Sequence, residues 1–150
     1  MSSSPSIRTA IKCVERADAF QISAENLYTA DDEWFAVCYF YAAYHLVRAA
    51  FIADPVFDSI QELAAKDGRL VMEDRFIERH QGRVDGRTRT LGVNDVVRLL
   101  YPDIAVEYRR LHAASVAVRY SEGLRTISPD TVLDDFNAVR AAYDAGLLRA

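Results

Sequence analysis

The sequence predicts an all-α fold, a bundle of about five to six helices that run mostly antiparallel. Apolar residues recur at intervals of three and four along most of the chain, which is the spacing of one helix face. No stretch alternates apolar and polar residues with the two-residue period of a strand. Proline and aspartate stand where helices would begin, and the connections between these segments are short, which favours antiparallel neighbours.

The size and composition of the chain suit one domain over 1–150, with a helical core over about 7–147. Its 150 residues are enough to bury a core without disulfides or metals. Hydrophobic residues make up 51% and charged residues 27%, as in an ordinary globular protein. No run suits a bilayer span and no signal-peptide pattern stands at the start, so we expect a cytoplasmic protein without membrane contact.

The first two helices have recognisable start signals. Pro5 suits the first turn of a helix that would continue to about Tyr28 with one apolar face. Asp31 and Asp32 then offer an N-cap and first-turn negative charge to a central helix over 34–51.

The central helix is apolar on every side, although it also carries tyrosines, a histidine and an arginine. It should end near Asp54-Pro55, because the residue before a proline leaves the helical conformation. A helix of this kind must be surrounded. Because a small bundle leaves surplus apolar surface to cover, we expect a homodimer.

The later elements follow from apolar spacing and from breakers. A third helix is predicted over 57–67, and a more highly charged helical segment over 70–81. Three glycines then interrupt regular structure, so 82–92 is expected to be a loop. Three further helices complete the bundle, at 93–100, 101–120 and 128–147.

Two tyrosine-rich helices each place polar side chains on one face. We call this set the polar seam, and it consists of Tyr41, His45 and Arg48 on the central helix and Tyr108, His112, Ser115, Arg119 and Tyr120 on the later one. Such groups are stable inside a protein only when they are hydrogen-bonded. The seam therefore predicts either a structural network that fixes helix register, or the lining of a nucleotide or RNA pocket, with arginine for phosphate and tyrosine for base stacking.

Positive charge gathers in one segment of an otherwise acidic protein. The net charge of −4 argues against a protein that coats nucleic acid through bulk charge. Five arginines nevertheless fall between residues 75 and 89, at Arg75, Arg79, Arg83, Arg87 and Arg89. This pattern is typical either of surface ion pairs or of a site that grips phosphate.

No metal or cofactor is expected. The three histidines, at 45, 80 and 112, have no mutual metal-ligand spacing and no carboxylate at a ligand offset. Cys13 and Cys38 lie in separate predicted helices and are interpreted as small core residues.

Two motifs carry a resemblance to a known family. They are Tyr-Phe-Tyr-Ala-Ala-Tyr-His-Leu over 39–46 and Tyr-x-x-Leu-x-x-x-Ser-x-x-x-Arg-Tyr over 108–120. With their helical context over about 7–147, they resemble HEPN domains, small helical bundles found in prokaryotic nucleases, toxins and nucleotide-handling accessory proteins. The resemblance implies a helical bundle whose tyrosine-rich helices pack together, and many such domains lack the catalytic pair.

HEPN nucleases carry an arginine followed four to six residues later by a histidine, and two protomers bring these pairs together to cleave RNA without a metal. Arg75 and His80 make one literal match. A histidine can act as general acid or base while an arginine stabilises the charged phosphorane. Phe76 stands where the family prefers a polar residue, and the pair precedes the late tyrosine-rich helix.

Two functions are expected as alternatives. The first is a non-catalytic binding or interaction module in a prokaryotic defence, toxin-antitoxin or nucleic-acid-related system, in which the arginine-rich segment contacts phosphate or an acidic partner protein. The second is a metal-independent endoribonuclease in which Arg75 and His80 catalyse and Arg79 and Arg83 hold the RNA backbone.

Overall fold

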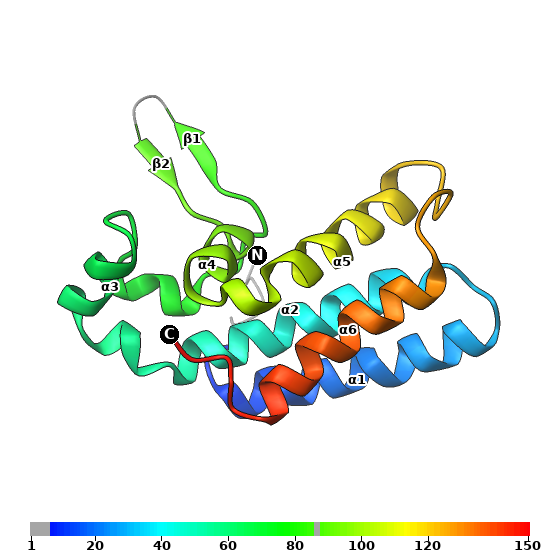
Figure 1. The fold of residues 1–150 in the computed structure, drawn as a ribbon, viewed down its shortest axis with the longest axis horizontal. Helices are drawn as coiled ribbons and strands as arrows, with labels where there is room; N and C mark the ends of the chain where they lie inside the picture. The colour runs from blue at the N-terminus through cyan, green and yellow to red at the C-terminus, as the bar shows by residue number, and fades with distance from the viewer. Residues whose placement is uncertain (1–6, 86–87) are drawn as a thin grey trace, which may run out of the picture.

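The computed structural model describes residues 7–85 and 88–150 and has the all-α bundle that the sequence predicts (Figure 1). The α-helices are α1 (Ala10–Thr29), α2 (Phe35–Ala53), α3 (Ile60–Lys66), α4 (Val93–Leu100), α5 (Pro102–Tyr120) and α6 (Pro129–Asp144). The other elements are two 3-10 helices, η1 (Pro55–Asp58) and η2 (Met72–Phe76), and two strands, β1 (Arg83–Asp85) and β2 (Thr88–Thr90).

Helix α2 is the centre of the bundle. Helices α1, α5 and α6 all pack against it, and 15 of its 19 residues are buried. By length and composition alone α2 could cross a membrane, contrary to our expectation that no run was suitable, but 83% of its apolar window is buried inside the bundle. Other helices of the same chain therefore cover most of the apolar surface of α2.

Short polar contacts set where the first two helices begin. The Thr9 hydroxyl accepts a hydrogen bond from the Lys12 amide at 3.2 Å and caps α1. Pro5, which the sequence suggested for this start, lies outside the described residues. Before α2, the Asp32 carboxylate accepts the Trp34 amide at 3.0 Å, and Trp34 itself is the N-cap.

The predicted proline boundaries are confirmed. Helix α2 ends at Ala53, and Asp54 before Pro55 has an extended conformation. Pro102 and Pro129 lie in the first turns of α5 and α6, where their missing amide hydrogens have no intrahelical partner to lose.

The predicted helix over 70–81 is wrong beyond the single turn of η2. The chain from residue 77 instead lies across the bundle, and its carbonyl groups find partners elsewhere. The oxygens of Ile77 and Glu78 accept hydrogen bonds from side chains of α2, and those of Arg79 and His80 accept from the first amides of α4. Because buried backbone groups must be paired, these tertiary bonds replace the helical ones.

The predicted loop over 82–92 contains a β-hairpin. Strands β1 and β2 pair antiparallel, with Arg83 opposite Thr90, and the hairpin projects from the bundle in Figure 1. Gly86 and Arg87, between the two strands, lie outside the described residues. At the base of the hairpin, a side chain at Gly92 would collide with the backbone of Gln81.

Candidate functional site

The polar seam meets between α2 and α5 only in part. The Arg119 guanidinium donates to the Tyr41 hydroxyl at 3.1 Å. His112 lies against the Phe40 ring with a centroid distance of 5.0 Å, and Tyr108 lies 5.7 Å from the same ring. Tyr41 therefore contacts the seam residues of α5, and Phe40 packs against His112 and Tyr108.

The other two seam residues of α2 face different neighbours. The His45 ring stacks on Phe20 of α1 with a centroid distance of 5.7 Å. Arg48 is 3% exposed and donates to the carbonyl oxygens of Ile77 at 3.1 Å and Ile7 at 2.9 Å. These two residues hold α1 and the segment after η2 against α2, which is a structural role.

The ring of His80 also packs among the aromatic side chains between α2 and α5, a position that the sequence did not predict. Its ring lies 4.7 Å from the Tyr44 ring, 5.7 Å from Tyr41 and 5.8 Å from His112, measured between centroids. The non-helical path of residues 77–82 brings it over α2, so a helical interpretation of this segment could not have predicted the contact.

Burial keeps the imidazoles of this region neutral. It lowers the pKa of His45 and of His80 to about 4, with a further contribution from Arg48 for the first and from His112 for the second. Burial also lowers the pKa of His112, helped by Arg119. The phenol of Tyr44 stays protonated, since burial raises its pKa to about 12.

The structure does not bring Arg75 and His80 together. Arg75 donates to the Asp58 carboxylate at 2.9 Å and to the carbonyl oxygen of Asp54 at 3.0 Å, beyond the end of α2. His80 contacts Tyr44, ten residues earlier on that helix, and ten helical residues span about 15 Å. Within one chain the pair therefore lacks the shared phosphate-sized site that the nuclease prediction requires, because Arg75 is engaged in tying η2 to η1.

The arginine-rich segment borders a hollow of about 650 Å³ between η2 and the hairpin. Arg79 and Arg83 line it, but so do Glu73, Asp74 and Glu78. The Arg79 side chain also donates to the carbonyl oxygen of Leu91 at 2.7 Å. Three carboxylates therefore lie beside these two guanidinium groups, and the predicted phosphate contacts of Arg79 and Arg83 stay predictions.

The last two arginines of the segment cannot be assigned a contact. Arg87 lies outside the described residues, and the side chain of Arg89 is likewise outside them. Their predicted phosphate contacts remain predictions.

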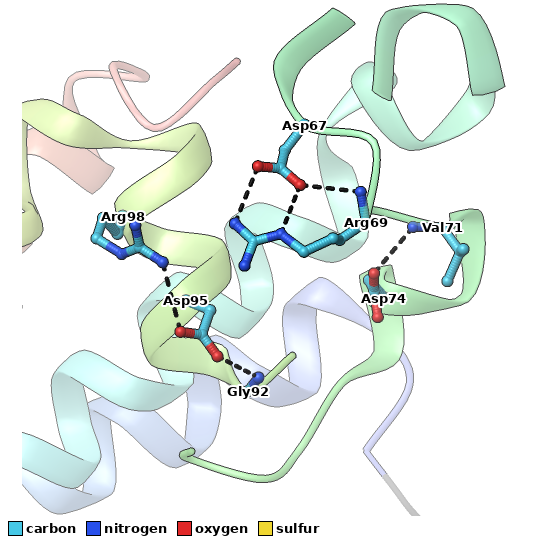
Figure 2. Close-up of polar contacts among 7 residues, drawn as sticks. All are labelled: Asp67, Arg69, Val71, Asp74, Gly92, Asp95 and Arg98. Carbon is cyan, nitrogen blue, oxygen red and sulfur yellow. Dashed lines mark hydrogen bonds and ion pairs between the residues drawn. The ribbon is translucent and has the colours of Figure 1, made fainter. Parts of the chain in front are cut away.

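A second hollow, of about 480 Å³, lies between α4 and α5 and has a different lining. We call it the α4–α5 groove, and its lining residues are Gln81, Asn94, Asp95, Arg98, Ala105, Val106, Tyr108, Arg109 and His112. The one carboxylate among these residues, Asp95, accepts the Gly92 amide at 2.9 Å and pairs with Arg98 at 3.6 Å (Figure 2). Because Arg98 and Asp95 pair with each other, Arg109 is left in the groove lining as a cation that no carboxylate of this lining neutralises, and an anion site requires such a charge.

Beyond the groove, basic side chains continue along one side of α5. Arg109, His112 and Arg119 repeat at helical intervals, and the ten residues from Arg109 to Arg119 span about 15 Å. At the far end Tyr120 is 76% exposed, with the Arg119 guanidinium 4.9 Å from its ring centroid. We call this face, together with Arg98 of the groove, the α5 track.

Sequence reasoning missed the groove residues of α4. The sequence placed His112 and Arg119 on one helix face with Tyr108 and Ser115, but it did not single out Arg109. The contribution of Arg98 and Asn94 was not predictable, because it depends on how α4 packs on α5.

In residues 7–85 and 88–150, no three His, Cys, Asp or Glu side chains lie close enough together to hold a metal ion.

Comparison of the chain with known protein families, with characterised proteins and with solved structures found no match. The resemblance to HEPN domains therefore stays a prediction from the sequence motifs, and the geometry of the α5 track is what bears on function.

Proposed function

We propose that this protein is a non-catalytic, HEPN-like module that binds single-stranded RNA or a nucleotide along the α5 track, in a prokaryotic defence, toxin-antitoxin or related nucleic-acid system. The observation that supports this most strongly is the α4–α5 groove, in which Asp95 and Arg98 pair with each other and the side chains of Arg109 and His112 remain to contact a ligand.

The track combines the two chemistries that single-stranded nucleic acid needs. Arginine grips phosphate through paired N–H donors, and an exposed tyrosine offers a flat face on which a base can stack. Arg109 has no ion-pair partner among the described residues, so its charge is available to a ligand. Tyr120 and Arg119 supply the stacking surface about 15 Å away along α5.

The same geometry favours binding over cleavage. A nuclease of the expected kind needs an arginine and a histidine at one phosphate, and Arg75 and His80 have separate partners. A pKa of about 4 also leaves His80 unprotonated near neutral pH, where a general acid must carry a proton. We therefore favour the groove, and not the Arg75–His80 pair, as the functional site.

A homodimer is a further part of this proposal, resting on a smaller surface than the sequence suggested. Most of α2 is covered within the chain, but Trp34 at its start is 47% exposed and Cys38 and Tyr41 are half-buried on the same side. This edge would contribute to a two-fold contact. Light scattering should give twice the monomer mass, and should return to one mass with Trp34→Glu.

The binding experiment uses a fluorescent oligouridylate and measures anisotropy over a range of salt concentrations. Arg109→Ala and Arg119→Ala should each weaken binding and reduce the slope of log affinity against log salt by about 0.7 for each phosphate that the variant no longer neutralises. Lys12→Ala, on an exposed part of α1, removes one charge outside the track and should leave both quantities unchanged.

The outcome that contradicts the proposal is binding that neither arginine variant weakens. The same samples, incubated in chelator and resolved by electrophoresis, test the nuclease alternative. Cleavage that disappears in His80→Ala would restore that alternative, whereas intact RNA agrees with a binding module.

A further inference from the structure

His112 occupies an unusual position in the α4–α5 groove. It lines the groove although only 9% of the residue is exposed. Its Nδ1 atom lies 3.1 Å from the side-chain nitrogen of Asn94. The other end of that amide, the Asn94 Oδ1 atom, is buried and has no hydrogen-bond partner in the described part of the chain. An acceptor without a donor therefore lies beside a ring that can gain a proton.

The charged groups around His112 are mostly positive. Arg109 and Arg119 lie on its own helix, and Arg98 with Asp95 lies on α4. The segment after η2 contributes His80. Helix α2 contributes the uncharged Phe40 and the phenol of Tyr41, which accepts a hydrogen bond from Arg119. Asp95 is already bound to the Gly92 amide and to Arg98. In the free protein an imidazolium at this position would face cations and lack a counter-charge.

We propose that binding of a phosphate-bearing ligand on the α5 track is coupled to the uptake of one proton by His112. This inference rests on the proposed function. The ligand brings the negative charge that the groove lacks, and the imidazole takes its proton from the solvent. The Asn94 amide then turns, which breaks the hydrogen bond from its Nδ2 to the ring and lets its Oδ1 accept the new Nδ1–H in its place. Nε2–H remains to donate to the phosphate.

The protonation states of the free protein agree with this order of events. Burial and the Arg119 charge hold the pKa of His112 below its ordinary value, so the free ring is neutral at neutral pH. An anion within hydrogen-bond distance raises the pKa of an imidazole. Binding and protonation are therefore linked, and each strengthens the other.

The test measures the affinity for a fluorescent oligouridylate from about pH 8 to about pH 5.5, since phosphodiesters do not titrate in this range. We expect affinity to rise as pH falls, by up to about tenfold per pH unit for one linked proton. Calorimetry in two buffers of different ionisation enthalpy counts the protons taken up. Circular dichroism at each pH confirms that the protein is folded.

Two variants locate the proton. In His112→Gln the dependence of affinity on pH should disappear, whereas His80→Gln should keep it. Loss of the dependence in His80→Gln with retention in His112→Gln would overturn the assignment. Tight binding of wild-type protein without any pH dependence would overturn the coupling and leave the proposed function in place, whereas no binding at any pH would overturn both.

Discussion

Acid should destabilise this protein because its buried imidazoles charge only after unfolding, and His45 allows the effect to be worked out. The residue is 7% exposed, stacks on Phe20, and has a buried Nδ1 atom without a partner in the described structure. Burial lowers its pKa from 6.5 to about 4. As pH falls below 6.5 the unfolded chain therefore takes up a proton that the folded chain refuses, and stability falls until pH approaches 4.

The size of the loss follows from the pKa difference. One pKa unit corresponds to about 1.36 kcal/mol, and about pH 5 lies roughly 1.5 units below the ordinary pKa of histidine, so His45 alone should remove about 2 kcal/mol of unfolding free energy between pH 7 and pH 5. His80 acts in the same direction, since burial also lowers its pKa to about 4. The loss is a large part of the stability of an ordinary domain.

Urea unfolding followed by circular dichroism at both pH values measures this loss. The control is His45→Phe, which keeps a ring on Phe20 but cannot take up a proton. Its loss between pH 7 and pH 5 should be smaller than that of the wild type by about 2 kcal/mol. Other groups, such as Asp74, titrate in both proteins and cancel in the difference. Equal losses in the two proteins would refute the reasoning.

Two further predictions concern buried carboxylates. Asp54 is 2% exposed and accepts a hydrogen bond from the Tyr101 hydroxyl at 2.9 Å. Tyr101→Phe should therefore lower the unfolding free energy by about 1–3 kcal/mol in urea titrations. An unchanged unfolding midpoint would contradict this prediction. Arg110 binds the buried Asp135 through two hydrogen bonds at 2.7 and 3.0 Å, but its side chain is half-exposed, so Arg110→Ala should cost about 1–2 kcal/mol. The adjacent Arg109→Ala should change the unfolding free energy by less than about 0.5 kcal/mol but weaken RNA binding. Melting experiments should therefore detect Arg110→Ala, and anisotropy experiments should detect Arg109→Ala.

The fold was predictable wherever local chemistry and tertiary packing agree. Proline restricts the backbone in any context, so it marks helix boundaries reliably. The starts of α5 and α6 lie at Pro102 and Pro129, and α2 ends before the Asp54-Pro55 step. The segment 70–81 was not predictable, because its apolar spacing is helical while Arg48 and the amides of α4 capture its carbonyl groups. Those partners are distant in sequence, so no local pattern reveals them.

The site was predictable only as a set of residue types. Helical spacing correctly placed His112 and Arg119 on one face of α5, and Tyr41 opposite them. It could not separate Tyr41, which contacts α5, from Arg48, which turns toward Ile77, because both lie on faces of a helix that is buried nearly all round. Which neighbour covers each face is decided by the packing of α1 and of the segment after η2.

Counting arginines along the sequence favoured the segment 75–89 for anion binding, whereas our proposal places the ligand on α5, and the reason for preferring α5 is general for an acidic chain. With a net charge of −4 there are enough carboxylates to pair with most guanidinium groups. Arg75 is held by Asp58, and Arg79 by a carbonyl group beside three carboxylates. A site for phosphate requires positive charge that the protein itself does not neutralise, and Arg109 in the α4–α5 groove has no ion-pair partner in the described structure.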